Sequence, residues 1–379
     1  MKKILITGGA GFIGSNIALK LVERGYCVTV LDTLSPQIHG IDPKKTSPLY
    51  QSILSKVNFL QGSVTNRADW EKASLCEQDA VIHLAAETGT GQSMYEIEKY
   101  VQVNIGGTAL LLDILTNTPH TVKKILVASS RAIYGEGKYL CKSHGAVYPL
   151  PRKDEQMQKG DFECKCPLCG SDVQLVATTE DSLIHPTSVY GITKQNQEQM
   201  VMTVCPTIGI EPVAFRYQNV YGAGQSLSNP YTGILSIFST RIKNRNGLTI
   251  FEDGKETRDF VYIDDVVDAT ILGLEKSEAG GRVFNVGTGV VTDVLTVANT
   301  LIQKYEEVVT VNVSGNYRLG DIRHNFADIS NAQTYLGFKP KVSFDQGIKK
   351  FVDWVNLQEI QDDKYEASIA EMKAKGLYK

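Results

Sequence analysis

The sequence predicts an α/β protein built on a doubly wound parallel sheet. Short runs rich in Val, Ile and Leu recur along the chain, with helical patterns between them. Such continuous apolar runs are typical of parallel strands that are buried on both faces. The first 32 residues already form a strand, turn, helix and strand, which is one βαβ unit. The expected strands are residues 2–7, 27–32, 57–62, 79–86, 123–130, 212–216 and 282–286.

The helices of this pattern are predicted in the intervening segments. The first covers residues 12–24 and ends at Gly25, and another covers residues 103–116. Two regions break the alternation: residues 136–180 form a loop-rich insert with cysteines and prolines, and residues 219–260 together with 290–379 suit a smaller C-terminal lobe. The large domain then comprises residues 1–135, 181–218 and 261–289. The charged tail from Asp362 onward is predicted to form a surface helix.

Composition limits the classes of partner. The 379 residues contain 39 basic and 42 acidic side chains, which gives a net charge of −3 and no excess for neutralising a nucleic-acid backbone. No apolar run approaches the length that spans a bilayer. Glycines interrupt the apolar stretch that follows Lys2 and Lys3, so no secretory signal is expected there. We therefore expect a cytoplasmic protein with neither a nucleic acid nor a membrane as its partner.

A glycine-rich turn follows the first expected strand and predicts a dinucleotide site. Gly8, Gly11 and Gly14 are spaced by three, and Phe12 and Ile13 open the following helix. This arrangement lets the chain turn sharply, lets a pyrophosphate approach the backbone, and offers helix N–H groups to phosphate oxygens.

The acidic residue of a dinucleotide site is also present. Asp32 ends the second strand, 24 positions after Gly8. Its carboxylate can accept hydrogen bonds from a ribose hydroxyl and repels a 2′-phosphate. No arginine follows closely, so NAD is favoured over NADP as the cofactor of a Rossmann-type domain.

A tyrosine and a lysine are placed for proton transfer. Tyr190 and Lys194 are four positions apart and lie on one face of a helix. Ser130 ends an expected strand, and the carboxyl ends of strands are where doubly wound sheets bind ligands. The ammonium and a cationic nicotinamide would both lower the pKa of the phenol. The three side chains can therefore remove a proton from a hydroxyl beside a hydride acceptor.

Six motifs together resemble the extended short-chain dehydrogenase/reductases, in the nucleotide-sugar epimerase/dehydratase group. They are TGGAGFIG, HLAA, SSRAIYG, YGITK, RYQNVYG and RDFVYIDD, in family order. The resemblance implies that Ser130, Tyr190 and Lys194 are catalytic and that a nucleoside-diphosphate sugar is the substrate. It also implies a homodimer. The implied substrate contacts are Ser130, Asn219, Arg258 and Arg318, and the implied contacts of tightly bound NAD are Gly8, Gly11, Phe12, Ile13, Gly14, Asp32, Ala85, Tyr190 and Lys194.

The residues after Ser130 distinguish the reactions of this group. Sugar 4,6-dehydratases of the family carry an Asp-Glu pair there, where this chain has Arg131 and Ala132, so elimination is disfavoured. A 4-epimerase needs only hydride transfer and one phenol, through a transient 4-keto sugar. Residues 219–238 and the cysteine insert resemble those of dTDP-L-rhamnose 4-epimerases, which implies interconversion with dTDP-6-deoxy-L-talose in cell-surface polysaccharide biosynthesis.

Three other functions remain open at this stage. The first is a 4-reductase acting on a dTDP-4-keto-6-deoxy sugar. The second is an epimerase for another nucleoside-diphosphate hexose, of the UDP-glucose type. The third, from a different class, is a non-catalytic NAD-binding regulator, against which the intact set of Ser130, Tyr190 and Lys194 argues.

The insert contains two similar turns with metal-ligand spacing. Cys141 and His144 are three positions apart, as are Cys166 and Cys169, and a glycine follows each pair. Four such ligands can enclose a structural Zn²⁺, as in a zinc ribbon. The bound metal would stabilise an insert that has only a small hydrophobic core. Cys164 is an alternative ligand to His144, and thiols without a metal are the other possibility.

Overall fold

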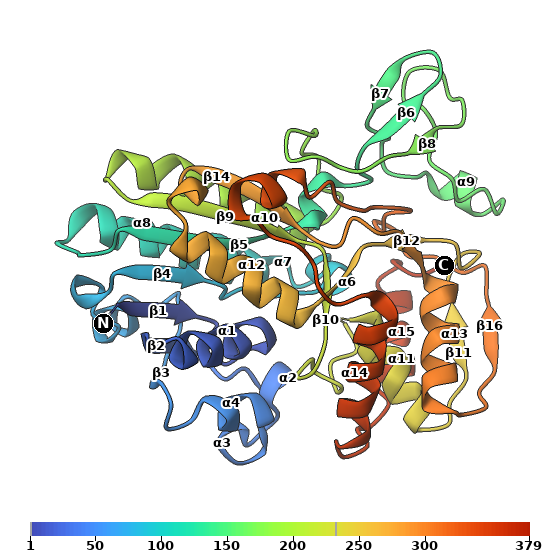
Figure 1. Cartoon of the computed structure of the whole chain (residues 1–379). Coiled ribbons are helices and arrows are strands. Elements are labelled where there is room, and N and C mark those ends of the chain that lie inside the picture. The colour runs from blue at the N-terminus through green and yellow to red at the C-terminus, as the bar shows by residue number, and fades with distance from the viewer. Residues whose placement is uncertain (1, 232) are drawn as a thin grey trace.

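The computed structural model describes residues 2–231 and 233–379, and a seven-stranded parallel sheet lies at its centre (Figure 1). The sheet runs β14 (Arg282–Val286), β9 (Glu211–Tyr217), β5 (Lys124–Ser130), β4 (Ala80–His83), β1 (Lys3–Thr7), β2 (Cys27–Asp32) and β3 (Asn58–Gln61). The strands β2 and β3 are added on one side of β1, and β4, β5, β9 and β14 are added on the other side, all parallel to it. Leu5 lies opposite Thr29 on one side and Val81 on the other.

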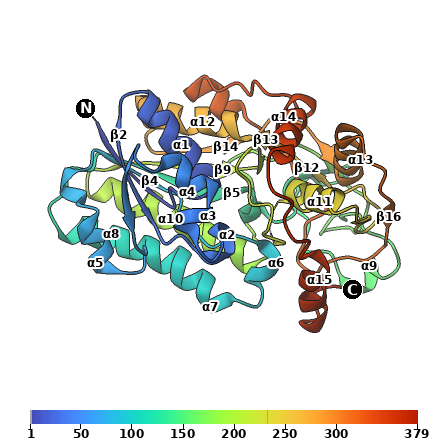
Figure 2. The same ribbon diagram turned by 90° about the horizontal axis from the view of Figure 1, so that it is seen from below.

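Helices cover both faces of this sheet, as a Rossmann-like fold requires (Figure 2). On one face α1 (Phe12–Glu23) and α12 (Ile263–Glu275) bury side chains such as Ile17 and Val266 against the strands. On the other face lie α5 (Arg67–Lys72), α8 (Gly107–Asn117) and α10 (Val189–Thr207), which bury Trp70, Leu111 and Val201. The sequence-based prediction of an α/β protein with a parallel sheet is confirmed.

Some predicted boundaries differ from the structure. The expected strand at 79–86 ends at His83, and residues 84–89 after it have no regular secondary structure. The helix expected at 103–116 begins as a short π-helical turn over residues 101–106 and becomes α8 only at Gly107. Between these two segments lie α6 (Thr90–Ser93) and α7 (Ile97–Tyr100), and three short helices follow β2: α2 (Pro36–His39), α3 (Pro43–Thr46) and α4 (Pro48–Ile53).

The C-terminal elements gather beyond the carboxyl ends of the strands (Figure 1). Their helices are α11 (Ile234–Lys243), α13 (Val294–Tyr305), α14 (Phe344–Asn356) and α15 (Tyr365–Ala374). Three two-stranded pairs accompany them: β10 (Asn219–Tyr221) with β13 (Phe260–Tyr262), β11 (Leu248–Ile250) with β16 (Val311–Val313), and β12 (Thr257–Arg258) with β15 (Thr292–Asp293).

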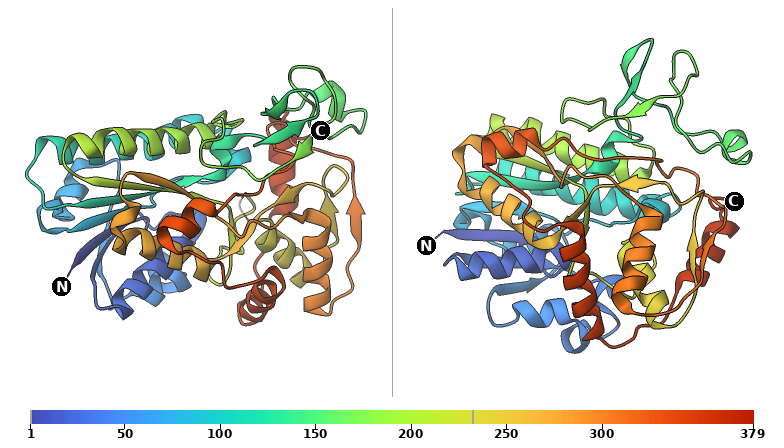
Figure 3. Two further views of the ribbon diagram at one scale, coloured as in Figure 1. Left: turned by 45° about the horizontal axis from the view of Figure 1, so that its top comes forward. Right: turned by 45° about the vertical axis from the view of Figure 1, so that its right-hand side comes forward.

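The insert at residues 136–180 projects from one corner of the molecule (Figure 3). It contains a small antiparallel sheet in the order β7 (Gly145–Val147), β6 (Tyr139–Cys141) and β8 (Gln174–Leu175), and the short helix α9 (Asp154–Met157). One small buried cluster consists of Tyr139, Cys141, Val147, Cys164 and Cys166, and Met157 and Phe162 form another with Tyr317. Within residues 2–231 and 233–379, no helix has both the length and the apolar character needed to cross a membrane.

Candidate active site

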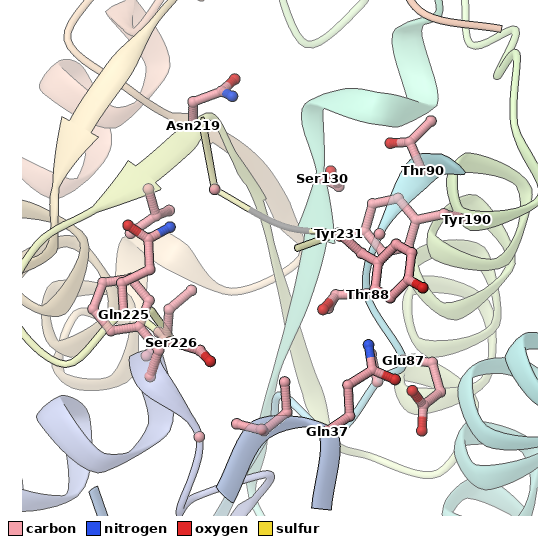
Figure 4. Close-up of a pocket in the computed structure, with 18 of the residues that line it drawn as sticks. Gln37, Glu87, Thr88, Thr90, Ser130, Tyr190, Asn219, Gln225, Ser226 and Tyr231 are labelled. Atoms are coloured by element: carbon pink, nitrogen blue, oxygen red, sulfur yellow. The ribbon is translucent and has the colours of Figure 1, made fainter. Parts of the chain in front are cut away.

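A cavity of about 610 Å³ opens at the carboxyl ends of β1, β2, β4 and β5. Its other walls come from the C-terminal elements, so the cavity lies where the sheet and those elements meet. Figure 4 shows Ser130, Tyr190 and Tyr231 on one side of this space, with Gln225 and Ser226 on the other. Of the residues that the sequence assigned to cofactor and substrate, all of the following line the cavity: Gly8, Gly11, Phe12, Ile13, Gly14, Asp32, Ala85, Ser130, Tyr190, Lys194, Asn219, Arg258 and Arg318.

The glycine-rich turn is too tightly packed for other residues. A Cβ on Gly14 would lie 2.3 Å from the carbonyl oxygen of Gly8, so the new helix could not approach the strand. Gly8 has a φ of +68°, and a Cβ there would meet the backbone of Ala85 at 2.8 Å. A Cβ on Gly11 would instead meet only the Gly8 carbonyl at 3.3 Å, and this side of the turn borders the cavity. The turn therefore fits a pyrophosphate held against helix N–H groups.

Asp32 lies at the same end of the sheet, with its carboxylate already oriented. One oxygen accepts a hydrogen bond from the backbone N–H of Ala10 at 3.0 Å, and the other accepts from Leu34 at 2.8 Å. A carboxylate has room for further donors, so a ribose hydroxyl can still bind. His39 lies 4.0 Å away, and burial lowers the pKa of its imidazole, so the ring adds little positive charge to attract a 2′-phosphate.

The three proposed catalytic side chains come from two elements. Ser130 ends β5, where its hydroxyl accepts a hydrogen bond from Ala132 and starts a 3₁₀ turn. Tyr190 and Lys194 lie one turn apart on α10, whose first turn is capped by Ser188 through a hydrogen bond from Gly191. A helix N-terminus carries partial positive charge, which favours an anionic phenolate nearby.

The pKa values in this group differ from the sequence-based expectation. Burial raises the pKa of Tyr190, while a hydrogen bond with Ser130 and the charge of Arg131 lower it. Burial also lowers the pKa of Lys194 to about 7, against the opposing charge of Glu198. The Lys194 ammonium donates to Gln197 at 2.7 Å. The pKa of Tyr190 is raised overall, contrary to the expected lowering, and Ser130 and Arg131 only partly offset the effect of burial.

Arg131 is the residue here that sequence reasoning undervalued. Its side chain lines the cavity, and its guanidinium donates a hydrogen bond to Asn219 at 3.1 Å. Burial and the nearby Arg258 lower its pKa to about 9. Its position directly after Ser130 is the signal in the sequence that could have indicated this.

Two further arginines are fixed by backbone and carboxylate partners. Arg258 donates to the carbonyls of Ile322 and Arg323 at 2.8 and 2.9 Å, and Arg318 pairs with Asp321 at 2.6 Å. Together with Arg131 they line the cavity, and Arg318 is held there by its ion pair with Asp321. Guanidinium groups arranged in this way suit a diphosphate.

Glu256 also lines this cavity and was not predicted. It is buried, one of its oxygens has no hydrogen-bond partner, and burial raises its pKa to about 7. Nothing in the sequence distinguishes this glutamate from a solvated one.

The four expected metal ligands are brought together at the tip of the insert. Their ligand atoms all lie within 4.8 Å of one another. Cys141 Sγ is 3.5 Å from His144 Nδ1 and 3.8 Å from Cys169 Sγ, and Cys166 Sγ is 3.6 Å from the same histidine nitrogen. Cys164 is not part of this group, because its buried thiol faces Tyr139 and Glu136.

Buried ion pairs connect the insert to the segment that carries Arg318. Arg152 pairs with Glu136 at 3.3 Å and Glu252 at 2.8 Å, and it donates to the carbonyl of Asp321 at 2.9 Å. Glu136 in turn accepts from the backbone N–H of Arg323 at 2.7 Å. The insert therefore contacts the backbone segment that carries Arg318 and accepts hydrogen bonds from Arg258.

The comparisons with known proteins agree with this geometry. The profile of the NAD dependent epimerase/dehydratase family matches residues 4–153 and 168–287. The chain is 37% identical to dTDP-L-rhamnose 4-epimerase of Burkholderia thailandensis over 355 residues, which cover 93% of this chain and 95% of that protein.

Solved structures are also similar. UDP-glucose 4-epimerase of Thermotoga maritima with UDP-glucose has a TM-score of 0.74 at 31% identity, covering 93% and 98% of the two chains. UDP-glucuronic acid 4-epimerase of Bacillus cereus, in complex with UDP-glucuronic acid and NAD, has a TM-score of 0.74 at 27% identity, covering 93% and 99%. With the glycine turn, Asp32 and the Ser-Tyr-Lys set in one cavity, this chain belongs to the NAD dependent epimerase/dehydratase family.

Proposed function

We propose that the protein is an NAD-dependent 4-epimerase of a nucleoside-diphosphate sugar, and that dTDP-L-rhamnose and dTDP-6-deoxy-L-talose are its substrate pair. The observation that carries the proposal is one cavity that joins the Asp32 end of the sheet, Tyr190 with Ser130, and the three arginines. The similarity to the Burkholderia thailandensis enzyme supports the choice of sugar and base.

In the proposed reaction each of these side chains has a separate task. Arg258 and Arg318 hold the diphosphate, so the 4-hydroxyl of the sugar reaches Tyr190. The chemistry that NAD supplies when bound against the glycine turn is reversible hydride acceptance from a carbinol carbon. Tyr190 takes the hydroxyl proton through its phenolate oxygen, and Ser130 donates a hydrogen bond to the same sugar oxygen. After the resulting 4-keto sugar has turned its other face to the site, Tyr190 returns the proton.

A reductase and an epimerase differ in their use of nicotinamide. The purified protein is incubated with dTDP-L-rhamnose and no added cofactor, and both epimers are followed by NMR. We expect many turnovers, because an epimerase restores its retained NAD in each cycle. A requirement for stoichiometric NADPH would instead favour the 4-reductase, and turnover of UDP-glucose alone would favour the other hexose epimerase.

Substitution of the phenol tests the mechanism. Tyr190→Phe removes the proton acceptor, so we expect kcat to fall by about 10²–10⁴-fold while nucleotide-sugar binding is retained. Tyr148→Phe, which alters a tyrosine outside the cavity, is the matched control. Unchanged activity of Tyr190→Phe would favour the non-catalytic NAD-binding regulator.

We propose that the insert holds one structural zinc ion through Cys141, His144, Cys166 and Cys169. A tetrahedral Zn²⁺ with Zn–S bonds of about 2.3 Å separates its sulfur ligands by roughly 3.8 Å. The spacing of 3.8 Å between Cys141 Sγ and Cys169 Sγ supports this geometry. Elemental analysis is expected to give about one zinc per chain, and none in Cys166→Ser, whereas Cys76→Ser at an exposed thiol should retain it. Zinc-free wild-type protein would contradict the proposal.

We also propose the division into an NAD-binding domain (1–135, 181–218 and 261–289), an insert (136–180) and a nucleotide-sugar lobe (219–260 and 290–379). A homodimer through the flank of the sheet is part of this proposal. Ile97, in α7, and Val101, directly after α7, support that surface, since both are apolar and exposed. Sedimentation at micromolar concentration tests it, with a monomer as the contradicting result.

A further inference from the structure

The C-terminal segment, residues 365–379, forms one wall of the active-site cavity. The sequence predicts a surface helix here, and α15 is indeed helical, but one of its faces is buried. Tyr365, Ser368, Ile369 and Met372 line the cavity, while Ala370 on the opposite face is exposed. Figure 2 shows α15 beside the edge where α6 and α7 lie.

This segment is fixed to the backbone that carries Arg318. Tyr317 and Lys379 exchange two backbone hydrogen bonds, of 2.9 and 3.0 Å, and Leu319 donates to the carbonyl of Leu377 at 2.9 Å. The Tyr231 hydroxyl also donates to Glu371 on the helix. These hydrogen bonds hold residues 365–379 in place against the cavity.

The buried face of α15 runs from Arg241 at its first turn to Gly91 of α6 near its last turn. At one end the ring of Tyr365 lies 4.3 Å from the guanidinium carbon of Arg241, and in the middle Ile369 belongs to an apolar cluster with Phe251. At the other end a Cβ on Gly91 would lie 3.4 Å from Met372 Sδ. Gly91 is in α6, where the hydroxyl of Ser93 accepts a hydrogen bond from the N–H of Tyr190 at 3.0 Å.

We propose that Ile369 and Met372 are specificity-determining residues that contact a methyl group of the nucleotide sugar. Neither side chain offers a strong hydrogen-bond partner, so a ligand hydroxyl placed against them would lose its hydrogen bonds to water and gain none from the protein. A methyl group makes no such hydrogen bonds and can be buried there without this cost. The inference rests on the proposed function, which provides two methyl groups: the one at C5 of a 6-deoxy sugar and the one on thymine.

Three ligands distinguish these two sources. Dissociation constants are measured by calorimetry for dTDP-L-rhamnose, dTDP-glucose and UDP-glucose, with wild type, Ile369→Asn and Met372→Gln. We expect either substitution to raise the dissociation constant of dTDP-L-rhamnose about tenfold, since the contact of one methyl group with a pocket contributes roughly that factor. The dissociation constant of UDP-glucose should rise less than threefold. If dTDP-glucose is weakened equally, thymine provides the methyl; if it is unchanged, the sugar does.

Control variants separate contact from folding. Met372→Leu keeps an apolar side chain and should bind like wild type, and Ala370→Gln on the exposed face should change nothing. Equal weakening of all three ligands, or no weakening of dTDP-L-rhamnose, overturns the inference. Failure of the proposed function has a different signature, because wild-type protein would then epimerise no nucleotide sugar whatever the dissociation constants of the variants.

Discussion

His83, at the end of β4, is a neutral core residue of the ligand-free chain. Its ring nitrogens lie 2.8 Å from the hydroxyl of Thr7 and 3.0 Å from that of Thr108. Complete burial, with a smaller contribution from the charge of Lys194, lowers its pKa from 6.5 to about 3. The ring is therefore uncharged at neutral pH and stabilises the packing between β1, β4 and α8.

This lowered pKa predicts a loss of stability in acid. Between pH 6.5 and about 3 the unfolded chain binds a proton at His83 that the folded chain does not, so stability falls as the pH falls. At pH 5 the loss is about 2 kcal/mol. Urea titrations at pH 7 and pH 5 should show this difference in wild type and a smaller one in His83→Gln. His185→Gln, at a partly exposed ring, is the control, and equal pH dependence in all three proteins would contradict the assignment.

Arg152, in the insert, forms buried ion pairs with Glu136 and with Glu252 of the C-terminal lobe. Its side chain is 2% exposed and neutralises Glu136 and Glu252, which are 1% and 3% exposed. Loss of one partner from a buried pair leaves an uncompensated charge, which costs more than the pair itself contributes.

We therefore expect Arg152→Met to lower the free energy of unfolding by about 3–5 kcal/mol. The same substitution at Lys3, whose pair with Glu77 is exposed, should have no measurable effect. Denaturant titration of both variants measures the difference. Equal stability of the two would show that the pairs in the insert are solvated.

At the scale of elements, the insert differs from the rest of the chain in how it is stabilised. The parallel sheet has extensive apolar cores on both faces, whereas the insert has one cluster of five buried residues and places Met157 and Phe162 in another with Tyr317. A segment with so little core needs another source of stability, and a bound metal can supply it.

Removal of the metal should therefore lower the local stability of the insert and leave that of the parallel sheet unchanged. On treatment with a chelator we expect backbone amides of β6, β7 and β8 to exchange hydrogen at least tenfold faster, while β1, β4 and β5 keep their protection. Hydrogen-exchange mass spectrometry measures both sets in one sample. In Cys166→Ser the insert should exchange rapidly with or without chelator, and slow exchange after chelation of wild type would contradict the role of the metal.

At the scale of the whole molecule, the cavity is shared between the sheet and the C-terminal elements. Gly8, Asp32 and Tyr190 belong to the sheet and to the turn and helix next to it. Arg258 and Met372 belong to the C-terminal elements. A ligand that spans both parts stabilises the folded state in proportion to its affinity.

A thermal-shift series tests this arrangement. We expect dTDP-L-rhamnose at 100 times its dissociation constant to stabilise the protein by about 2.7 kcal/mol, and dTDP alone to do less at the same concentration. Arg258→Gln should reduce both shifts because the diphosphate loses a cation. Lys350→Gln, at an exposed lysine outside the cavity, is the control, and equal shifts in the two variants would place the diphosphate elsewhere.

Much of the fold and of the site was predictable because it depends on local order along the chain. The glycine spacing, the apolar runs and the pair Tyr190–Lys194 are each set within a few residues. The role of Arg131, the position of Cys164 and the buried face of α15 were not predictable. Each depends on which distant segment lies opposite: Asn219 for Arg131, Glu136 for Cys164, and the backbone of residues 317–319 for the end of the chain.

The sequence by itself determined the α/β class, the parallel sheet and the family, because periodicity and motifs are properties of the chain in order. Only the tertiary structure decided how the pKa values of Tyr190 and Lys194 depart from their ordinary values, since burial and neighbouring charge arise when distant segments meet. It also decided that the last helix borders the active-site cavity: a charged tail has the same composition whether its apolar face meets water or a ligand site.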